Sequence, residues 1–317
     1  MSIKNKTNEL YINRLYDAPV KMVWDAWVDP QKVGQWWGPR GFTITTVSKD
    51  VRTGGSWVYT MHGPDGVDYP NHTKFLEVEK YSRLVYDHGA GKDRPPMFRV
   101  TVHFTEVNGQ TKMEMAMALP TAEAAANTKK FIKKAGGDAT WDRLAEYLSE
   151  EKSKKDIFVI NRSFEAPVDM MFNMFTDPNQ LSQWLPPTGF TMQYLKPDIK
   201  IGGTSVYCMT GPNDMKMYGK ANYQQIEKPN RIVYTQYFCD QNENITRHPM
   251  APTWPEAMLT TIEFEAEEDN KTRVCITWEV FGKATDIERE TFHNGKPGMT
   301  IGWTGSLDKL EDYLRRK

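Results

Sequence analysis

Cysteine is scarce in this sequence. The three cysteines, Cys208, Cys239 and Cys275, all lie in the second half of the 317 residues. An odd number with no short spacing excludes a disulfide framework and a zinc knuckle, since both need paired cysteines at set spacings. We therefore expect free thiols on strands, no metal site and no cofactor.

Long apolar runs are also lacking. No stretch reaches the roughly 18 apolar residues that cross a bilayer, and the opening MSIKNKTNEL has no apolar segment of the kind found in a secretion signal. We expect a cytoplasmic protein without a membrane span.

An excess of charge of one sign is missing too. Residues 1–150 carry 20 basic and 18 acidic side chains, residues 151–317 carry 20 and 23, and the net charge is −1. Neither half has the positive excess that attracts phosphate backbones, so nucleic acid is not expected as a partner. Glycine-rich phosphate loops, a nucleophile elbow and a helical His-Glu metalloprotease pattern are absent, and the sequence gives no positive sign of an enzyme.

The sequence does contain an internal repeat of about half its length. Shifted by 148 positions, residues 14–86 align with residues 162–234 without a gap, and 26 of the 73 pairs are identical. The second copy then has a longer loop at about 237–255, and the ends agree again as LAEYL (144–148) and LEDYL (310–314). A period of this length is a whole domain. We predict domains at 1–150 and 151–317 with a charged joint, and a monomer in which duplication takes the place of a homodimer.

Each copy has the same predicted order of elements. Alternating strands at 9–16 and 157–164 open the copies. Two short helices follow, the first with Pro19 or Pro167 at its first position and the second capped by Asp29 or Asp177 with proline next. Strands with period-two alternation and short loops then predict an antiparallel meander.

A closing helix completes each copy. Apolar stripes predict helices at 140–149 and about 300–316, and each stripe needs a surface on which to be buried. The concave face of a curved antiparallel sheet is the available one. The predicted fold class is therefore α+β, with each sheet wrapped around its C-terminal helix.

Spaced motifs connect both copies to a known family. The chain resembles the heat-shock-protein-90 ATPase activator homologue family, within the START-related helix-grip group also called SRPBCC. The motifs that carry the resemblance are APV (18–20), DP (29–30), QWWGPRGF (35–42), GG (54–55), GP (63–64), RLVY (83–86) and the closing LAEYL, with counterparts in the second copy. The resemblance implies two tandem helix-grip domains, each with a cavity between sheet and closing helix. That group includes carriers, cyclases and chaperone-associated domains, so it does not fix the function.

Pleat alternation selects the strand side chains expected to line these cavities, and Trp36, Phe42, Trp184 and Phe190 are expected by the cavity mouth. They are mostly aromatic or methionine, which suits an adaptable apolar pocket. They are Trp36, Phe42, Trp57, Tyr59, Met61, Tyr86, Phe98, Met115 and Met117 in the first copy, and Trp184, Phe190, Tyr207, Met209, Tyr234, Met258, Trp278 and Trp303 in the second. The 17 methionines and 10 tryptophans favour a cavity over a tight core of Leu, Ile and Val. Packing of the same residues as plain core remains the alternative.

No catalytic set repeats between the copies. The histidines have no histidine counterparts where the alignment can be checked, and His248 and His293 are expected in loops. A buried polar group with a shifted pKa would mark an enzyme. The candidates are Tyr59, Tyr86, His88, Tyr207, Tyr234 and Cys208, of which only the tyrosines recur.

Three functions follow from these observations. The favoured one is non-catalytic binding of a small hydrophobic or amphipathic molecule in one or both cavities. The second is a chaperone-associated role like that of the ATPase activators, although those proteins join one such domain to a different amino-terminal domain. The third is a cyclase, hydrolase or isomerase that uses the cavity.

Overall fold

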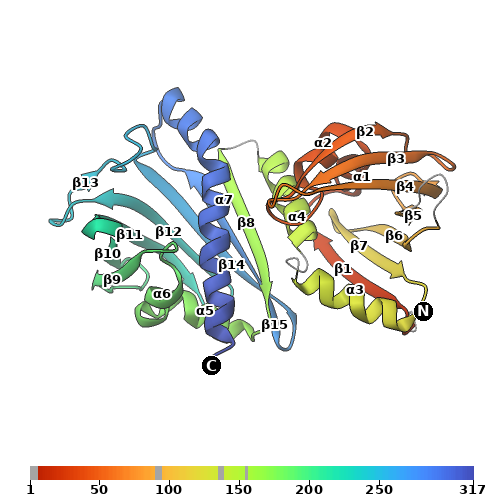
Figure 1. The fold of residues 1–317 in the computed structure, drawn as a ribbon. Helices are drawn as coiled ribbons and strands as arrows, with labels where there is room; N and C mark the ends of the chain where they lie inside the picture. The colour runs from red at the N-terminus through yellow and green to blue at the C-terminus, as the bar shows by residue number, and fades with distance from the viewer. Residues whose placement is uncertain (1–5, 90–94, 135–138, 154–155) are drawn as a thin grey trace. The chain divides into compact units, whose positions relative to one another are not determined.

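The computed structural model describes residues 6–89, 95–134, 139–153 and 156–317. They form two compact units, Met1–Lys152 and Ser153–Lys317, each with its own sheet and core (Figure 1). Each unit is a curved antiparallel sheet with helices, so the predicted α+β fold in tandem copies is confirmed.

The first unit has the strand order β1-β7-β6-β5-β4-β3-β2. Its strands are β1 (Glu9–Tyr16), β2 (Thr43–Lys49), β3 (Ser56–His62), β4 (Asp68–Glu79), β5 (Arg83–His88), β6 (Phe98–Val107) and β7 (Gln110–Ala118). Its helices are α1 (Val20–Val28), α2 (Pro30–Trp36), α3 (Ala122–Lys134) and α4 (Ala139–Ser153). The meander is closed by β7 pairing with the opening strand β1, with Ile12 opposite Met115.

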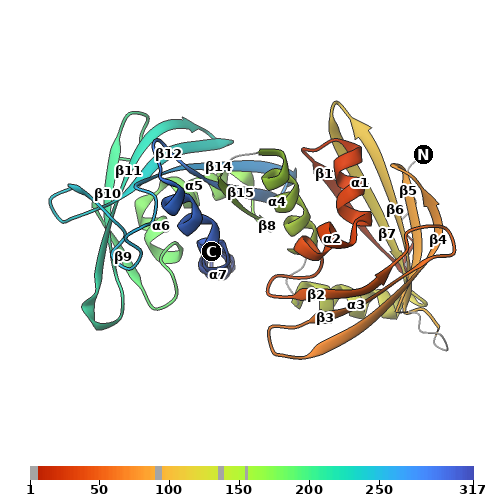
Figure 2. The same cartoon turned by 90° about the horizontal axis from the view of Figure 1, so that it is seen from above.

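The second unit repeats this order as β8-β15-β14-β12-β11-β10-β9, with β13 paired to β12. Its strands are β8 (Ile157–Phe164), β9 (Thr191–Lys196), β10 (Thr204–Thr210), β11 (Lys216–Glu227), β12 (Arg231–Cys239), β13 (Ile245–Thr246), β14 (Ala257–Glu268) and β15 (Lys271–Val280). Its helices are α5 (Val168–Thr176), α6 (Pro178–Trp184), the 3₁₀ turn η1 (Pro212–Asp214) and α7 (Asp286–Leu314). Seen from above, the sheet curves around α5, α6 and α7 (Figure 2).

Local signals in the sequence account for the helix starts. The Asp29 side chain accepts a hydrogen bond from the Gln31 amide at 2.8 Å, and Asp177 does the same for the Asn179 amide at 2.8 Å, so α2 and α6 begin as predicted. Pro19 lies one place earlier than predicted: it is the N-cap of α1, not its first residue.

The paired glycines form a corner before β3 and β10. Gly54 and Gly202 have φ of +83° and +75°, which glycine adopts at little cost. A Cβ on Gly55 would lie 2.2 Å from the carbonyl oxygen of Asp50, so only glycine fits there. The corner therefore turns the chain into the strand that carries Tyr59 or Tyr207.

The closing helices differ from the prediction. In the second unit, α7 starts at Asp286, well before the predicted 300, because Thr285 and Glu288 form a capping box and the helix continues through Pro297. In the first unit, α3 precedes α4 and was not predicted. The Gly-Lys-Pro-Gly run at 295–298 hid the first part of α7, whereas the alanine-rich stretch at 122–126 favours a helix and could have revealed α3.

An ion pair ties the opening strand of each unit to its closing helix. Arg14 of β1 lies 3.7 Å from Asp142 of α4, with both side chains almost fully buried. At the equivalent positions Arg162 of β8 lies 2.6 Å from Asp308 of α7, where the Asp308 side chain is 59% exposed. The equivalent ion pair is therefore buried in the first unit and partly exposed to solvent in the second.

Candidate functional site

A cavity of about 260 Å³ lies inside the second unit, between the concave face of its sheet and α7. Helices, strands and the β12–β14 connection all contribute to its wall. The lining is formed by Phe175, Leu181, Leu185, Pro187, Tyr194, Ser205, Tyr207, Met209, Met217, Tyr218, Gly219, Ala221, Tyr223, Tyr234, Gln236, Phe238, His248, Ile262, Trp278, Met299, Gly302, Trp303 and Ser306. Among these described residues none is Lys, Arg, Asp or Glu.

One face of α7 forms the helical side of the cavity. Met299, Gly302, Trp303 and Ser306 follow the i, i+3, i+4, i+7 spacing that places side chains on one stripe. A Cβ built on Gly302 would meet no atom within 4 Å, so this glycine leaves space open beside the cavity. Trp303 packs edge-on against Trp278 of β15, with 5.7 Å between ring centroids.

Four tyrosines from neighbouring strands form the opposite side. Tyr194 and Tyr207 lie 6.0 Å apart between ring centroids, and Tyr223 and Tyr234 lie 5.5 Å apart. Burial raises the pKa of all four, that of Tyr223 to about 12, so each hydroxyl keeps its proton at neutral pH. Hydroxyls in this state can donate hydrogen bonds and do not act as bases.

Gly219 of β11 makes room for one of these rings. It lies opposite Tyr207 in the strand register. A Cβ at this position would come within 2.2 Å of Tyr207 Cζ. The tyrosine therefore lies flat across its neighbouring strand, a position that any other residue at 219 would obstruct.

The long β12–β14 connection, residues 240–256 and here called the arm, packs on α7. Arg247 forms an ion pair with Glu288, and the Trp254 ring lies 5.7 Å from the Phe292 ring. The arm carries His248 to the cavity wall, where its Nδ1 accepts a hydrogen bond from the Met250 amide at 3.0 Å. Burial lowers the pKa of His248, so the imidazole is neutral at pH 7.

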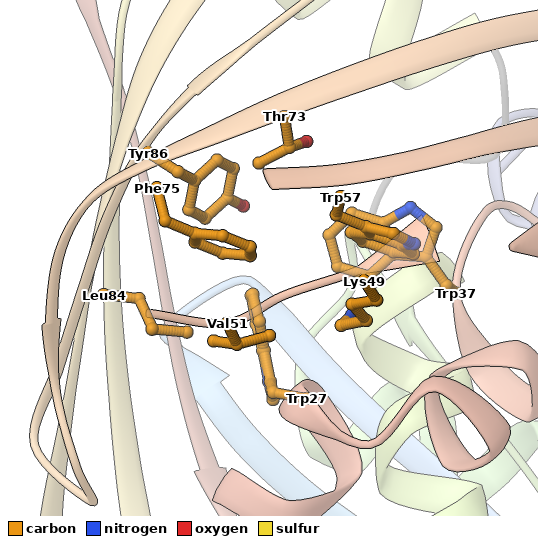
Figure 3. Close-up of a pocket in the computed structure, with 9 residues that line it drawn as sticks. All are labelled: Trp27, Trp37, Lys49, Val51, Trp57, Thr73, Phe75, Leu84 and Tyr86. Carbon is orange, nitrogen blue, oxygen red and sulfur yellow. The ribbon is translucent and has the colours of Figure 1, made fainter. Parts of the chain in front are cut away.

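At the equivalent place in the first unit, the described residues enclose only a small hollow. The hollow measures about 10 Å³ and is lined by Trp27, Trp37, Lys49, Val51, Trp57, Thr73, Phe75, Leu84 and Tyr86 (Figure 3). Holding even one water needs roughly 10–15 Å³. Tryptophans occupy the interior: Trp27 stacks on Trp141 at 5.7 Å, and Trp37 lies edge-on 5.1 Å from Trp57. The expectation of a cavity in each copy is wrong for the first, because tryptophan there fills the space.

Smaller residues replace these tryptophans in the second unit. The internal alignment pairs four tryptophans of the first unit with a residue of lower volume. The pairs are Trp27 with Phe175, Trp37 with Leu185, Trp57 with Ser205 and Trp141 with Leu307. The two copies share one fold, so these four smaller side chains account for the cavity in the second copy and the packed core in the first.

Lys49 is an unusual member of the first unit's packing. Its Nζ lies 3.4 Å from the centroid of the Trp57 ring, a cation–π contact. Burial lowers the pKa of the amine to about 7, with the Asp29 charge partly opposing the shift. The amine therefore titrates near neutrality within an aromatic surrounding.

Comparison with known proteins also divides the chain into two domains. The family model described as Activator of Hsp90 ATPase homolog 1-like protein matches residues 17–149 and again residues 165–315. The chain belongs to this family. No curated protein matches the sequence.

Solved structures resemble single activator-homologue-like domains of this chain. A protein from Nitrosomonas europaea is 23% identical over 48% of this chain and 100% of its own, with a TM-score of 0.44. A protein from Mycobacterium smegmatis is 21% identical over 50% and 91%, with a TM-score of 0.42. An AHSA1 protein from Silicibacter pomeroyi is 16% identical over 50% and 97%, with a TM-score of 0.39.

The expected lining residues of the first activator-homologue-like domain fall into three groups. Trp57 and Tyr86 line its small hollow. Trp36, Tyr59 and Met115 are fully packed core. The remaining ones are half-buried: Phe42, Met61, Phe98 and Met117. Plain core packing, the alternative interpretation, fits Trp36, Tyr59 and Met115.

In the second activator-homologue-like domain, five expected residues line the cavity: Tyr207, Met209, Tyr234, Trp278 and Trp303. Trp184 and Met258 belong to the core instead. Phe190 is half-buried and packs over Gly211, where an added Cβ would lie 2.4 Å from its ring.

Sequence reasoning missed part of the cavity wall. The missed residues include Tyr194, Tyr223, Gln236, His248, Met299 and Gly302. Tyr194 and Tyr223 could have been found by extending the pleat alternation to β9 and β11. His248 could not, because it reaches the wall through the irregular arm.

The two acid–base candidates that are not tyrosines, Cys208 and His88, are not among the residues that line the cavity. Cys208 lines a surface groove with Thr210, Lys216 and Gln241, on the face of β10 opposite Tyr207. His88 stacks on Phe98 at 4.7 Å, and burial lowers its pKa to about 4.

His293 lies in α7 and not in a loop as expected, and its Nε2 is 2.5 Å from Asp156. Among the described residues no three His, Cys, Asp or Glu side chains are grouped to hold a metal ion. In the same part of the chain, no helix is long and apolar enough to cross a bilayer.

Proposed function

We propose that the second activator-homologue-like domain binds a small, largely apolar molecule without chemical change, and that the first domain does not. The main support is the difference in cavity volume between two domains of the same fold: about 260 Å³ in the second domain and about 10 Å³ in the first. An apolar cavity of about 150 Å³ holds benzene, and pockets for drug-sized ligands measure roughly 300–1,000 Å³. A substituted single ring or a fused pair of rings fits between these limits.

The chemistry of the wall supports this proposal. Three methionines, Met209, Met217 and Met299, adapt to varied shapes, and the tyrosines add polar tips to an apolar surface. The protonated tyrosines and the neutral His248 offer hydrogen bonds to a guest.

Methyl-labelled methionine offers a direct test. In ¹³C-methyl NMR of the full chain, indole should shift Met209, Met217 and Met299 and leave Met113 and Met115 of the first domain unchanged. No shift at any cavity methionine up to millimolar indole would refute binding.

Two glycines of α7 supply the matched variants. Gly302→Phe places a benzene-sized ring in the cavity and should abolish the indole shifts. Gly298 is exposed and also has no atom within 4 Å of its Cβ position, so Gly298→Phe should leave binding intact. Equal binding by both variants would place the indole elsewhere.

A chaperone partner is the second candidate, and it rests on the family description alone. A pull-down with the Hsp90 chaperone and an ATPase assay test it. Stimulation that survives Gly302→Phe would assign the chain a chaperone role independent of the cavity.

A further inference from the structure

The cavity of the second domain has polar groups but no charge. None of the described residues that line it carries a carboxylate, an ammonium or a guanidinium group. His248 is the one lining group whose ordinary pKa lies near neutrality, and burial lowers it. Because its Nδ1 accepts from the Met250 amide, the neutral ring carries its proton on Nε2. A charged guest would therefore meet no counter-charge.

Within the described residues, the hydroxyls of Tyr194 and Tyr207 in the wall have no protein partner. The Tyr223 hydroxyl is hydrogen-bonded to the Ser205 hydroxyl at 3.1 Å. Tyr194 and Tyr207, in contrast, make no side-chain hydrogen bond within the described part of the chain. Both keep their protons at neutral pH, so each has a donor to offer.

We propose that the guest is an uncharged molecule of one or two rings with a hydrogen-bond acceptor, such as a carbonyl oxygen, that the Tyr194 and Tyr207 hydroxyls bind. This rests on the proposed function of the cavity. Transfer of an ionised group from water into this wall would cost several kcal/mol without a partner to offset it. A quaternary ammonium in an aromatic cage is the competing occupant, and the missing carboxylate argues against it.

Four probes of nearly equal size separate these classes. Acetophenone has a neutral acceptor, cumene has the same shape without one, benzoate is anionic and phenyltrimethylammonium is cationic. Titration of the full chain at pH 7.5 by methionine-methyl NMR should give the order acetophenone, cumene, then the two ions. We expect acetophenone to bind roughly two- to tenfold more tightly than cumene, the value of one net hydrogen bond, and each ion at least about tenfold more weakly than acetophenone.

A double variant tests the assigned donors. Tyr194→Phe with Tyr207→Phe keeps the rings and removes both hydroxyls, so the preference for acetophenone over cumene should disappear while cumene still binds. Tyr237 lies on β12 between the lining residues Gln236 and Phe238, on the face turned away from the cavity, so Tyr237→Phe is the control and should retain the preference. An unchanged preference in the double variant would overturn the role of the two tyrosines.

The outcomes distinguish the two proposals. Tightest binding of benzoate or phenyltrimethylammonium would overturn the uncharged class and leave the cavity as a binding site. Failure of all four probes, together with indole, would overturn the proposed function itself.

Discussion

Trp57 should be the residue whose loss opens the first domain. Its side chain is 4% exposed, stacks on Tyr59 at 4.0 Å between ring centroids, and donates a hydrogen bond from Nε1 to Thr46 at 3.2 Å. The equivalent residue in the second domain is Ser205, so Trp57→Ser reproduces the hollow copy at this point. Loss of a buried tryptophan ring costs about 3–5 kcal/mol. This is a large part of the roughly 5–15 kcal/mol that stabilises a domain.

The assay has two parts. Urea unfolding followed by tryptophan fluorescence should show the first domain losing about 3–5 kcal/mol, and Trp57→Phe, which keeps a ring, should lose less. In methyl NMR, indole should now shift Met61, which follows Trp57 and Tyr59 on the same face of β3 and should not shift in the natural protein. The reciprocal variant, Ser205→Trp, should fill the second cavity and abolish the indole shift of Met209.

Two results would refute this reasoning. A loss below about 1 kcal/mol, the range of ordinary surface substitutions, would show that the Trp57 ring is not part of a close-packed interior. Full indole binding by Ser205→Trp would show that the difference in side-chain volume at this position does not decide which copy is hollow.

The remaining predictions concern charge and strand packing. Asp142→Asn should cost about 3–5 kcal/mol because it removes the negative charge that faces a buried arginine, whereas Asp308→Asn should cost less than about 1 kcal/mol; equal losses in urea unfolding would contradict the difference in burial. Lys49 binds its proton more weakly when folded, with a pKa of about 7, than when unfolded, so it should make stability rise with pH between about 7 and 10. Lys49→Met should remove that rise and stabilise the first domain at pH 6, as measured by unfolding at both ends of the range. Gly219→Ala should push the Tyr207 ring aside, cost about 1–3 kcal/mol and weaken indole binding; unchanged binding in the NMR titration would show that the ring position does not shape the cavity.

The fold was largely readable from the sequence because its signals are local and occur twice. The strand alternation at 9–16 and 157–164 predicted β1 and β8 to the residue, and the Asp-Pro pairs predicted α2 and α6. The full length of α7 was not predicted, because a proline with glycines near it, as at Pro297, usually ends a helix. Here the capping box at Thr285 and the packing of the arm hold the helix through them.

Local sequence signals could not predict which of the two domains contains a cavity. Alternation shows that Trp57 and Ser205 both face inward, but it does not give the volume that remains once side chains from several strands and helices meet. Abundant tryptophan was interpreted as favouring a cavity, and that interpretation is wrong for the first domain, where Trp27, Trp37 and Trp141 complete the packing. Occupied volume depends on contacts between distant segments, which single positions do not encode.

The proposed binding by the second domain alone would make the stability of only that half of the chain depend on the concentration of a guest. A ligand that binds the folded second domain alone adds RT ln(1 + [L]/Kd) to its free energy of unfolding, about 2.7 kcal/mol at a hundredfold excess over Kd. The first domain receives no such increment. On heating, the unfolding temperature of the second domain would therefore rise with the concentration of the guest, while that of the first domain would stay constant. The first domain would thus serve as an internal control for ligand binding by the second.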